Sequence, residues 1–573
     1  MDSLENEQNK GRLQLFFIVS LVAYFFWFSQ LPPPVQQDNS LTSSNIQTDV
    51  VNLNNPNNVN TTNSVENADS ASSSNVSSAK VTYTEQSIQT PSQSILISSK
   101  NGSVSNTSLQ EYKVIPQTQS WWGWIFSGMK DSWKSYQGGQ DTLSVLSKDA
   151  QLLVIGEEDS IVEDVYTITK VSESSVRAEA TINNMVVTKT YTFHTGEVRK
   201  PADKYTIDIQ VSITNNRSTE IAGLWLGMFD TMVDNDGRFD NISRPQFYVE
   251  EELIGTFGTM FSTSFSSLKD LEEPTKFSTE PEWFGIGSRY FLSAIAPVKS
   301  GTFKDISTYK RSDSVYGSVA HLQSNIDPGA TRTIDLIAYV GPRQMDILEG
   351  LGDSWMDSVE YGMFGFFSRV LLFMLKVIYA GFNNWGVAIL LLTLVVKVIF
   401  FPLTQKAFIS GKKMQMIQPQ LNEIKEKYKD NQQLQAQETM KLFSENGVSP
   451  FGGCLPSLVQ IPVWLALYNV MYSSVELYNS HFLYLQDLTS MDPYGVLAVL
   501  YIVLMFIQQQ MTPMVNMDPA QQTMLKVMPL IFGVFMFTFP SGLVLYFSMN
   551  MLLTIFQQWL IKIQFESKNP VEA

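Results

Sequence analysis

The sequence predicts a polytopic α-helical membrane protein with six transmembrane helices, five of them in one core, and an exported all-β sandwich domain. Apolar segments long enough to cross a bilayer lie near the N-terminus and again after residue 385. Between these regions, polar and apolar residues alternate with the period of two that is typical of half-buried strands. The net charge of -16 argues against a general nucleic-acid binder, because neutralising phosphates requires clustered Lys and Arg.

The first part of the chain is predicted to be a cytoplasmic segment (1–12), a transmembrane anchor (13–31) and a disordered exported linker (32–79). A signal peptide is the alternative to the anchor. However, no small-x-small cleavage site follows the apolar residues, and aromatic residues gather at their far end. No Lys or Arg occurs between Arg12 and Lys80, so the positive-inside rule places the N-terminus in the cytoplasm. The linker is rich in Asn, Ser and Thr and has too little apolar area to fold.

Residues 80–345 are predicted to form the sandwich. The alternating pattern is clearest at 176–182, 205–213 and 333–340. Turn clusters such as Asp327-Pro328-Gly329 separate the strands, which favours antiparallel pairing. The acids of 230–240 could form a calcium loop, but the twelve-residue spacing with its terminal Glu is absent, so a solvated loop is the better interpretation. An exported sandwich could also bind a sugar or a peptide, and the sequence does not decide this.

Two apolar segments follow the sandwich. Residues 361–382 carry Arg369 and Lys376 on one helical face and are predicted to be an amphipathic helix in the membrane interface. Residues 385–403 are predicted to be transmembrane helix 2, with a length of about 28 Å. Lys397 lies deep in this segment, where a charge costs at least a few kcal/mol, and is therefore a functional-site candidate. Alternatively, its side chain snorkels to the inner end of the helix, about 9 Å away.

Residues 404–449 are predicted to form a cytoplasmic helical hairpin. The stretch is basic, and its apolar residues repeat every three or four positions. Pro419 is expected to bend the first helix of this hairpin. The candidate docking residues are Lys412, Lys413, Lys425, Lys427 and Lys429. A solvated connector, whose apolar stripe only closes the hairpin, is an equally good interpretation.

The remaining chain is predicted to cross the membrane four more times. The segments are transmembrane helix 3 (451–472), an exported loop (473–493), transmembrane helix 4 (494–511), a cytoplasmic loop (512–525), transmembrane helices 5 (526–540) and 6 (541–561), and a cytoplasmic tail (562–573). The exported loop has no Lys or Arg between Glu476 and Asp492, whereas Lys562 and Lys568 mark a cytoplasmic end.

The sequence contains no motif typical of a metal site or a catalytic centre. Its 3 histidines are far apart, and its single cysteine, Cys454, excludes an intramolecular disulfide. No HExxH, GxSxG or P-loop motif occurs, and no pair of carboxylates lies within a predicted transmembrane segment. We therefore expect a protein that is not an enzyme and that uses no metal or other cofactor.

Long ordered strings in the second half of the chain are similar to one known family. These strings are EWFGIGSRYFLSAIAP, YGMFGFFSRVLLFMLK, NNWGVAILLLTLVVKVIFFPLT, VSPFGGCLPSLVQIPVWLALYNVMYSSVEL and DPAQQTMLKVMPLIFGVFMFTFPSGLVLYFSMN. They resemble the YidC-type (YidC/Oxa/Alb) membrane protein insertases, in the Gram-negative form with a large periplasmic domain. The resemblance covers about 280–561 well and the rest of the sandwich by position and strand pattern.

This resemblance implies a bacterial inner-membrane protein that inserts and helps fold nascent membrane proteins, alone or with the Sec translocon. Both termini would be cytoplasmic and the sandwich periplasmic. It also implies a hydrophilic groove, open to cytoplasm and lipid, that holds a cation. The family usually has arginine there, and Lys397 stands at that position. Lysine keeps the charge but lacks the planar fork, so attraction and water retention are expected in place of carboxylate clamping. The ribosome is an expected partner, although the chain ends soon after Lys568 without the long basic tail of some members.

Polar residues in other predicted helices extend the candidate groove. Besides Lys397, the groove candidates are Gln460, Gln508, Asn550 and Gln557. Each could instead form a helix–helix hydrogen bond, which we expect for about half of them. A secondary transporter with an intramembrane lysine is the alternative function, since six spans and Pro-broken helices would suit it. However, the sequence contains no second copy of 385–403, whereas transporter folds commonly show internal repeats.

Overall fold

The computed structural model describes most of the chain after residue 82. The described residues are 83–113, 142–146, 150–157, 160–161, 164–195, 200–231, 244–255, 276–311, 315–429, 431–447, 455–511 and 519–568. The predicted N-terminal anchor and linker, and Cys454, lie outside these residues.

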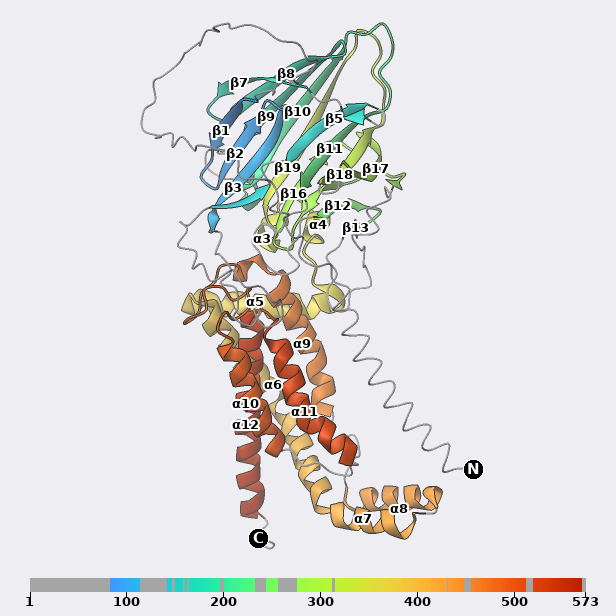
Figure 1. Cartoon of the computed structure of the whole chain (residues 1–573), viewed down its shortest axis with the longest axis vertical. Coiled ribbons are helices and arrows are strands. Elements are labelled where there is room, and N and C mark those ends of the chain that lie inside the picture. Colours follow the sequence, from blue (N-terminus) through green and yellow to red (C-terminus); the bar gives the residue numbers. More distant parts are fainter. Residues whose placement is uncertain are drawn as a thin grey trace, which may run out of the picture. The chain divides into compact units, whose positions relative to one another are not determined.

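Two antiparallel sheets form the sandwich (Figure 1). The first has the order β1-β2-β3-β5-β11-β18-β17-β14, with β4 paired to β3 and β6 to β5. Its strands are β1 (Glu85–Gln89), β2 (Gln93–Ser98), β3 (Ser103–Lys113), β4 (Thr142–Leu146), β5 (Gln151–Glu157), β6 (Ser160–Ile161), β11 (Leu224–Thr231), β14 (Lys276–Phe277), β17 (Phe303–Lys310) and β18 (Val315–Leu322).

The second sheet has the order β13-β12-β15-β16-β19-β10-β9-β8-β7. Its strands are β7 (Thr167–Ser172), β8 (Ser175–Ile182), β9 (Met185–Phe193), β10 (Thr206–Asn215), β12 (Arg244–Val249), β13 (Glu252–Ile254), β15 (Trp283–Gly287), β16 (Phe291–Pro297) and β19 (Thr331–Pro342). The predicted antiparallel sandwich is therefore confirmed.

The alternation seen in the sequence follows the pleat of these strands. In β10, Ile207, Ile209 and Val211 are buried, whereas Asp208 and Gln210 between them are exposed. β10 pairs with β19 on one side and β9 on the other, so its apolar face covers the core between the sheets.

The candidate calcium loop gains no support from the described residues. Asp230 is a buried residue of β11, and residues 232–243 lie outside the described part. Within the described ranges, no group of three or more His, Cys, Asp or Glu is placed to hold a metal ion.

Helices make up the C-terminal part, where α5 lies crosswise to the bundle helices in Figure 1. After the short α3 (Met345–Leu348) and α4 (Asp353–Met356), the helices are α5 (Gly365–Phe382), α6 (Trp385–Met416), α7 (Gln418–Lys427), α8 (Gln432–Glu445), α9 (Leu455–Ser473), α10 (Val496–Met511), α11 (Pro519–Met536) and α12 (Ser541–Lys568). Helix α12 packs against α6, α9 and α10, and α5 packs against α6 and α9.

Prolines place two helix boundaries differently from the sequence prediction. α6 continues through Pro402 to Met416 and does not end at Leu403. The Thr404 hydroxyl donates to the carbonyls of Phe400 and Phe401 in the turn that contains this proline. The predicted first helix of the hairpin is interrupted next to Pro419, as a break and not as a bend: α6 ends at Met416, and α7 begins at Gln418 with Pro419 in its first turn. A proline in the first turn has no helical N–H bond to lose.

The last loop before the final helices is also shorter than expected. α11 begins at Pro519, inside the segment 512–525 that was predicted to be a cytoplasmic loop. Proline favours the first helical position because its fixed φ angle suits a helix start.

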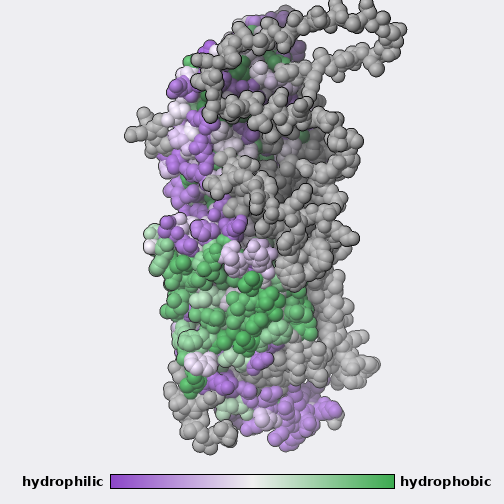
Figure 2. Space-filling model, turned by 60° about the vertical axis from the view of Figure 1, so that its left-hand side comes forward, coloured by the Kyte–Doolittle hydropathy of each residue, from purple (hydrophilic) through white to green (hydrophobic). Residues whose placement is uncertain are grey.

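Hydrophobic side chains form a band over the helical part on the face in Figure 2, bordered by hydrophilic surface. Among the described residues, three helices are long and apolar enough to cross a membrane: Gly365–Phe382, Trp385–Met416 and Ser541–Ile563. Val496–Met511 is a shorter apolar helix. The count of six spans and the interfacial position of 361–382 stay predictions.

Candidate functional site

Lys397 is held between α6 and α12. Its side chain is buried at 9% exposure. The ammonium Nζ donates to Thr554 Oγ1 at 2.7 Å and to Asn550 Oδ1 at 3.2 Å. Both acceptors are neutral, and no carboxylate of the described residues forms an ion pair with this lysine. The cation is therefore solvated by two side chains of the neighbouring helix and not neutralised by them.

Asn550 connects this lysine to a third helix. Its Oδ1 also accepts a hydrogen bond from Gln460 Nε2 of α9 at 3.5 Å. Gln460 Nε2 donates as well to the hydroxyl of Tyr546, at 3.3 Å. A lysine has donors and no acceptor, so Asn550 must turn its oxygen toward Lys397. One polar cluster thus spans α6, α9 and α12.

Gln557 lies between α12 and α6 but does not bond to Lys397. Its Nε2 donates to Thr404 Oγ1 at 2.8 Å and to the carbonyl of Phe401 at 3.4 Å. The side chain is 3% exposed. These contacts make Gln557 part of the α6–α12 packing, which is the helix–helix role considered as its alternative.

Gln508 lies half-buried on α10, which packs against α11 and α12. It does not hydrogen-bond to Lys397, whose partners are both on α12. The structure therefore brings together Lys397, Gln460 and Asn550, and it leaves Gln508 and Gln557 outside their hydrogen-bonded cluster.

Two residues of the cluster were missed from the sequence, Tyr546 and Thr554. Both are common in apolar helices and neither stands out alone. Their spacing with Asn550 is the signal that was available, because positions 546, 550 and 554 are four apart and share one helix face. A search for polar residues at this spacing would have found both.

The five candidate docking lysines belong to the end of α6 and to α7 with the turn after it. Lys413, Lys425, Lys427 and Lys429 are exposed, and Lys412 is half-buried. Helices α7 and α8 pack together (Figure 1) around Ile417, Leu421, Leu442 and Phe443. The apolar stripe therefore closes the hairpin, and the lysines lie on its surface.

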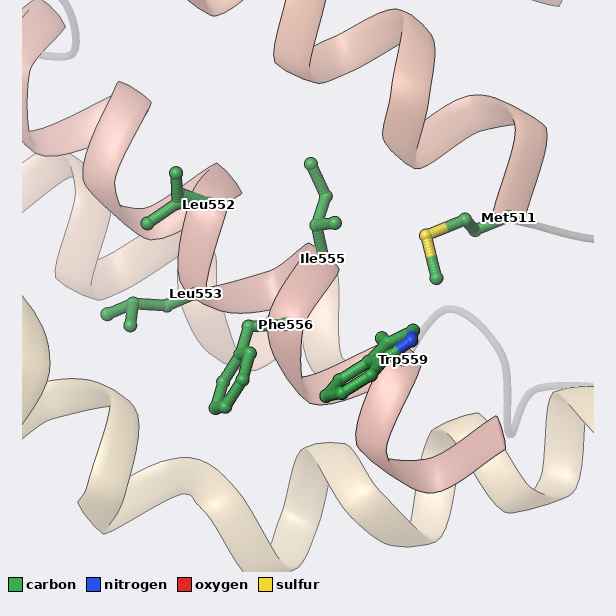
Figure 3. Close-up of a pocket in the computed structure, with 6 residues that line it drawn as sticks. All are labelled: Met511, Leu552, Leu553, Ile555, Phe556 and Trp559. Carbon is green, nitrogen blue, oxygen red and sulfur yellow. The ribbon is translucent and has the colours of Figure 1, made fainter. Parts of the chain in front are cut away.

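A cavity of about 360 Å³ lies between the end of α10 and α12 (Figure 3). Its lining side chains are all apolar: Met511, Leu552, Leu553, Ile555, Phe556 and Trp559. Leu552, Phe556 and Trp559 are half-exposed, whereas Asn550 and Gln557 point inward from the other side of α12. The cavity is suited to hydrocarbon and is separate from the lysine cluster.

Two family models match the chain, "60Kd inner membrane protein" at residues 377–568 and "YidC periplasmic domain" at residues 85–374. The membrane protein insertase YidC of Geobacter metallireducens is 31% identical over 493 residues, which are 84% of this chain and 86% of that protein. The protein of the same name from Marinobacter nauticus is 36% identical over 397 residues, 68% of each chain. A crystal structure of an active YidC insertase with its first transmembrane domain resolved is 18% identical, with a TM-score of 0.34, and covers 82% of this chain and 91% of that chain. Both relatives are named as insertases and not as enzymes.

Proposed function

Because this chain belongs to the YidC family of membrane protein insertases, we propose that it inserts nascent inner-membrane proteins and helps them fold through a groove centred on Lys397. The family assignment and the apolar helices make it a multi-pass inner-membrane protein with a periplasmic domain. The groove, its opening to cytoplasm and lipid, and its use of a positive charge are the proposed parts.

The buried, unneutralised Lys397 carries this proposal. A charge among apolar helices is costly, and helix packing alone would be served as well by a neutral residue. An ammonium held by two neutral acceptors has no counter-ion in the cluster, so its charge can attract an incoming anion. That arrangement suits the temporary binding of an acidic substrate segment better than it suits a permanent structural ion pair.

The mechanism is the lowering of a transfer barrier. A polar or acidic segment that crosses hydrocarbon alone costs several kcal/mol for each charge. A hydrated, positive groove part-way across the membrane offers that segment hydrogen bonds and an opposite charge, while its apolar helix moves sideways into lipid. No covalent bond changes in this process.

The expected partners follow from the same proposal. Nascent chains would arrive from ribosomes or from the Sec translocon at the cytoplasmic side, where the α7–α8 hairpin would present its exposed lysines. The positive-inside rule supports cytoplasmic positions for both termini and for this hairpin. The surrounding bilayer is the acceptor of the inserted helix.

Reconstituted insertion tests the proposal directly. The full chain is placed in liposomes with two versions of a small membrane protein, whose exported segment is either acidic or neutral. We expect Lys397→Ala to lower insertion of the acidic version and Lys397→Glu to lower it further. Equal insertion by all three proteins would contradict a role for the charge. Measurement of solute flux in the same liposomes separates the insertase from the alternative transporter, which alone predicts flux.

A further inference from the structure

We propose that Thr554 and Asn550 are positioning residues, which keep the Lys397 ammonium inside the helical bundle with one N–H left for a single acidic oxygen of the substrate. This inference rests on the proposed insertase function. In this view the charge belongs to α6, but residues of α12, which is distant in the sequence, determine where it lies.

The position of the ammonium needs an explanation because a lysine at this depth could instead extend its side chain to the membrane interface. Its long stem allows the charged end to reach toward the water at the inner end of the helix. In the structure, Nζ instead lies 2.7 Å from Thr554 Oγ1 and 3.2 Å from Asn550 Oδ1. Removal of these acceptors would leave the interface as the better-solvated place for the charge.

The Thr554 hydroxyl acts only as an acceptor toward Lys397, because its proton is used elsewhere. The hydroxyl donates its one proton to the carbonyl of Asn550 in the preceding turn, at 2.7 Å. The lone pairs of Oγ1 are then free to face Lys397. Serine can reproduce this geometry, whereas valine has the same shape without the oxygen.

Asn550 adds a second acceptor that is fixed from two sides. Lys397 and Gln460 both donate to its Oδ1, so the amide cannot turn its nitrogen toward the cation without losing two hydrogen bonds. An ammonium has three N–H groups, and two of them are directed to α12. The third has no acceptor among the described residues, and it suits one oxygen of a carboxylate.

Thr393 provides a matched control for this assignment. It is a buried threonine of α6 whose hydroxyl also donates to its own helix, at 2.7 Å from the carbonyl of Ile389. That hydroxyl is not one of the hydrogen-bond acceptors of Lys397, which are Asn550 and Thr554. Thr393→Val therefore removes the same atoms as Thr554→Val without removing an acceptor of the cation.

The test compares four single variants of the full chain in liposomes: Thr554→Val, Thr554→Ser, Thr393→Val and Lys397→Ala. A fifth protein combines Thr554→Val with Lys397→Ala. We expect Thr554→Val to insert the acidic substrate roughly tenfold less well, as for the loss of one hydrogen bond to a charged group. Thr554→Ser and Thr393→Val should stay close to wild type, and the neutral substrate should be unaffected. Thr554→Val should add no further loss to Lys397→Ala.

A second readout is independent of insertion. A membrane-impermeant amine-acylating reagent should modify Lys397 faster in Thr554→Val than in Thr393→Val, because the released ammonium moves toward water. Unchanged labelling together with unchanged insertion would overturn the positioning role while Lys397→Ala still supports the proposed function. A full additional loss in the double variant, or an equal loss for both substrates, would also overturn it. Normal insertion by Lys397→Ala would instead reject the proposed function itself.

Discussion

Lys397 on α6 and Thr554 on α12 are joined by a hydrogen bond of 2.7 Å between two residues that are 157 positions apart in the chain. The bond gives a buried cation a neutral partner. A carboxylate in the place of Thr554 would neutralise the lysine and leave little attraction for a substrate, whereas an alkyl group would leave it unsolvated. A hydroxyl avoids both outcomes, because it accepts a hydrogen bond from the ammonium without carrying a charge.

Lys397→Arg is expected to keep most of the insertion activity. The guanidinium retains the charge, and its N–H groups can reach the same two acceptors of α12. Its planar fork also leaves further donors for a substrate carboxylate, so insertion of the acidic substrate should equal or exceed that of wild type. The measurement is insertion of the acidic and neutral substrates side by side, and activity as low as that of Lys397→Ala would count against this view.

Gln557→Leu is expected to weaken helix packing without selecting between substrates. The change removes the hydrogen bonds from Gln557 to Thr404 and Phe401. Hydrogen bonds between membrane helices contribute about 0.6 to 1.7 kcal/mol. Thermal unfolding in detergent should show this loss, with the two substrates affected equally. A defect confined to the acidic substrate would instead indicate that Gln557 is part of the substrate groove.

Lys376→Ala is expected to destabilise the protein more than Asp346→Ala. Lys376 of α5 lies 2.7 Å from Asp346, which is 63% exposed, and 3.0 Å from Glu476, which is 6% exposed. Loss of the lysine leaves the buried carboxylate unpaired, at about 3 to 5 kcal/mol, whereas an exposed pair contributes about 1 kcal/mol or less. Thermal unfolding of both variants checks the order. Glu476→Gln should restore much of the stability lost in Lys376→Ala, and failure of this rescue would argue against the paired charge.

Because of Lys189, the free energy of unfolding of the sandwich is expected to fall as the pH is lowered. Lys189 is fully buried on β9, where its Nζ donates to the carbonyls of Asn101 at 2.6 Å and Leu153 at 2.8 Å. Burial lowers the pKa of Lys189 from 10.5 to about 7. The unfolded chain therefore binds more protons than the folded one between these values, and stability rises with pH in that window and is lowest and level below it.

The free energy of unfolding of the wild-type sandwich should increase by roughly 2 kcal/mol between about pH 7 and about pH 9, given about 1.4 kcal/mol for each pKa unit. Hydrogen exchange of the β9 and β10 amides in the full chain measures it. Lys189→Met should lose this pH dependence, although it leaves two carbonyls unsatisfied. The same slope in both proteins would exclude Lys189 as its source.

Gly287→Ala is expected to disrupt the end of the second sheet. A Cβ built on Gly287 would overlap the guanidinium of Arg343 and the side chain of Gln246. Arg343 is 2% exposed and donates to Gln246 and to the carbonyls of Phe291 and Ser358, so its displacement would break these buried hydrogen bonds. Overpacking of this kind costs about 1 to 3 kcal/mol.

Gly381→Ala serves as the control for Gly287→Ala, because an added Cβ at Gly381 meets no atom within 4 Å. The melting temperature should fall for Gly287→Ala and stay level or rise for the control. Equal melting temperatures would show that Arg343 can be displaced at little cost.

Local patterns in the sequence were sufficient for the fold class. The period of two in 205–213 predicted a strand with one buried face, and β10 has that face. The apolar run 385–403 predicted a helix around Lys397, and it lies inside α6. Both are properties of neighbouring residues, since strand and helix faces repeat every 2 and about 3.6 positions. The prolines were harder to interpret, because Pro402 lies inside the continuous α6 whereas Pro419 lies in the first turn of α7.

The sequence by itself determined that a cation lies deep in an apolar helix, because charge and hydropathy are properties of each residue. Only the tertiary structure decided which residues hold it. Gln460, Asn550 and Gln557 looked alike as amides in apolar segments, yet Asn550 bonds Lys397, Gln460 bonds Asn550, and Gln557 bonds Thr404. Thr554 gave no signal of its own, because a hydroxyl becomes a cation acceptor only when packing brings α12 against α6. The partners of a buried charge are set by the way helices distant in the chain pack together, and hydropathy does not contain that information.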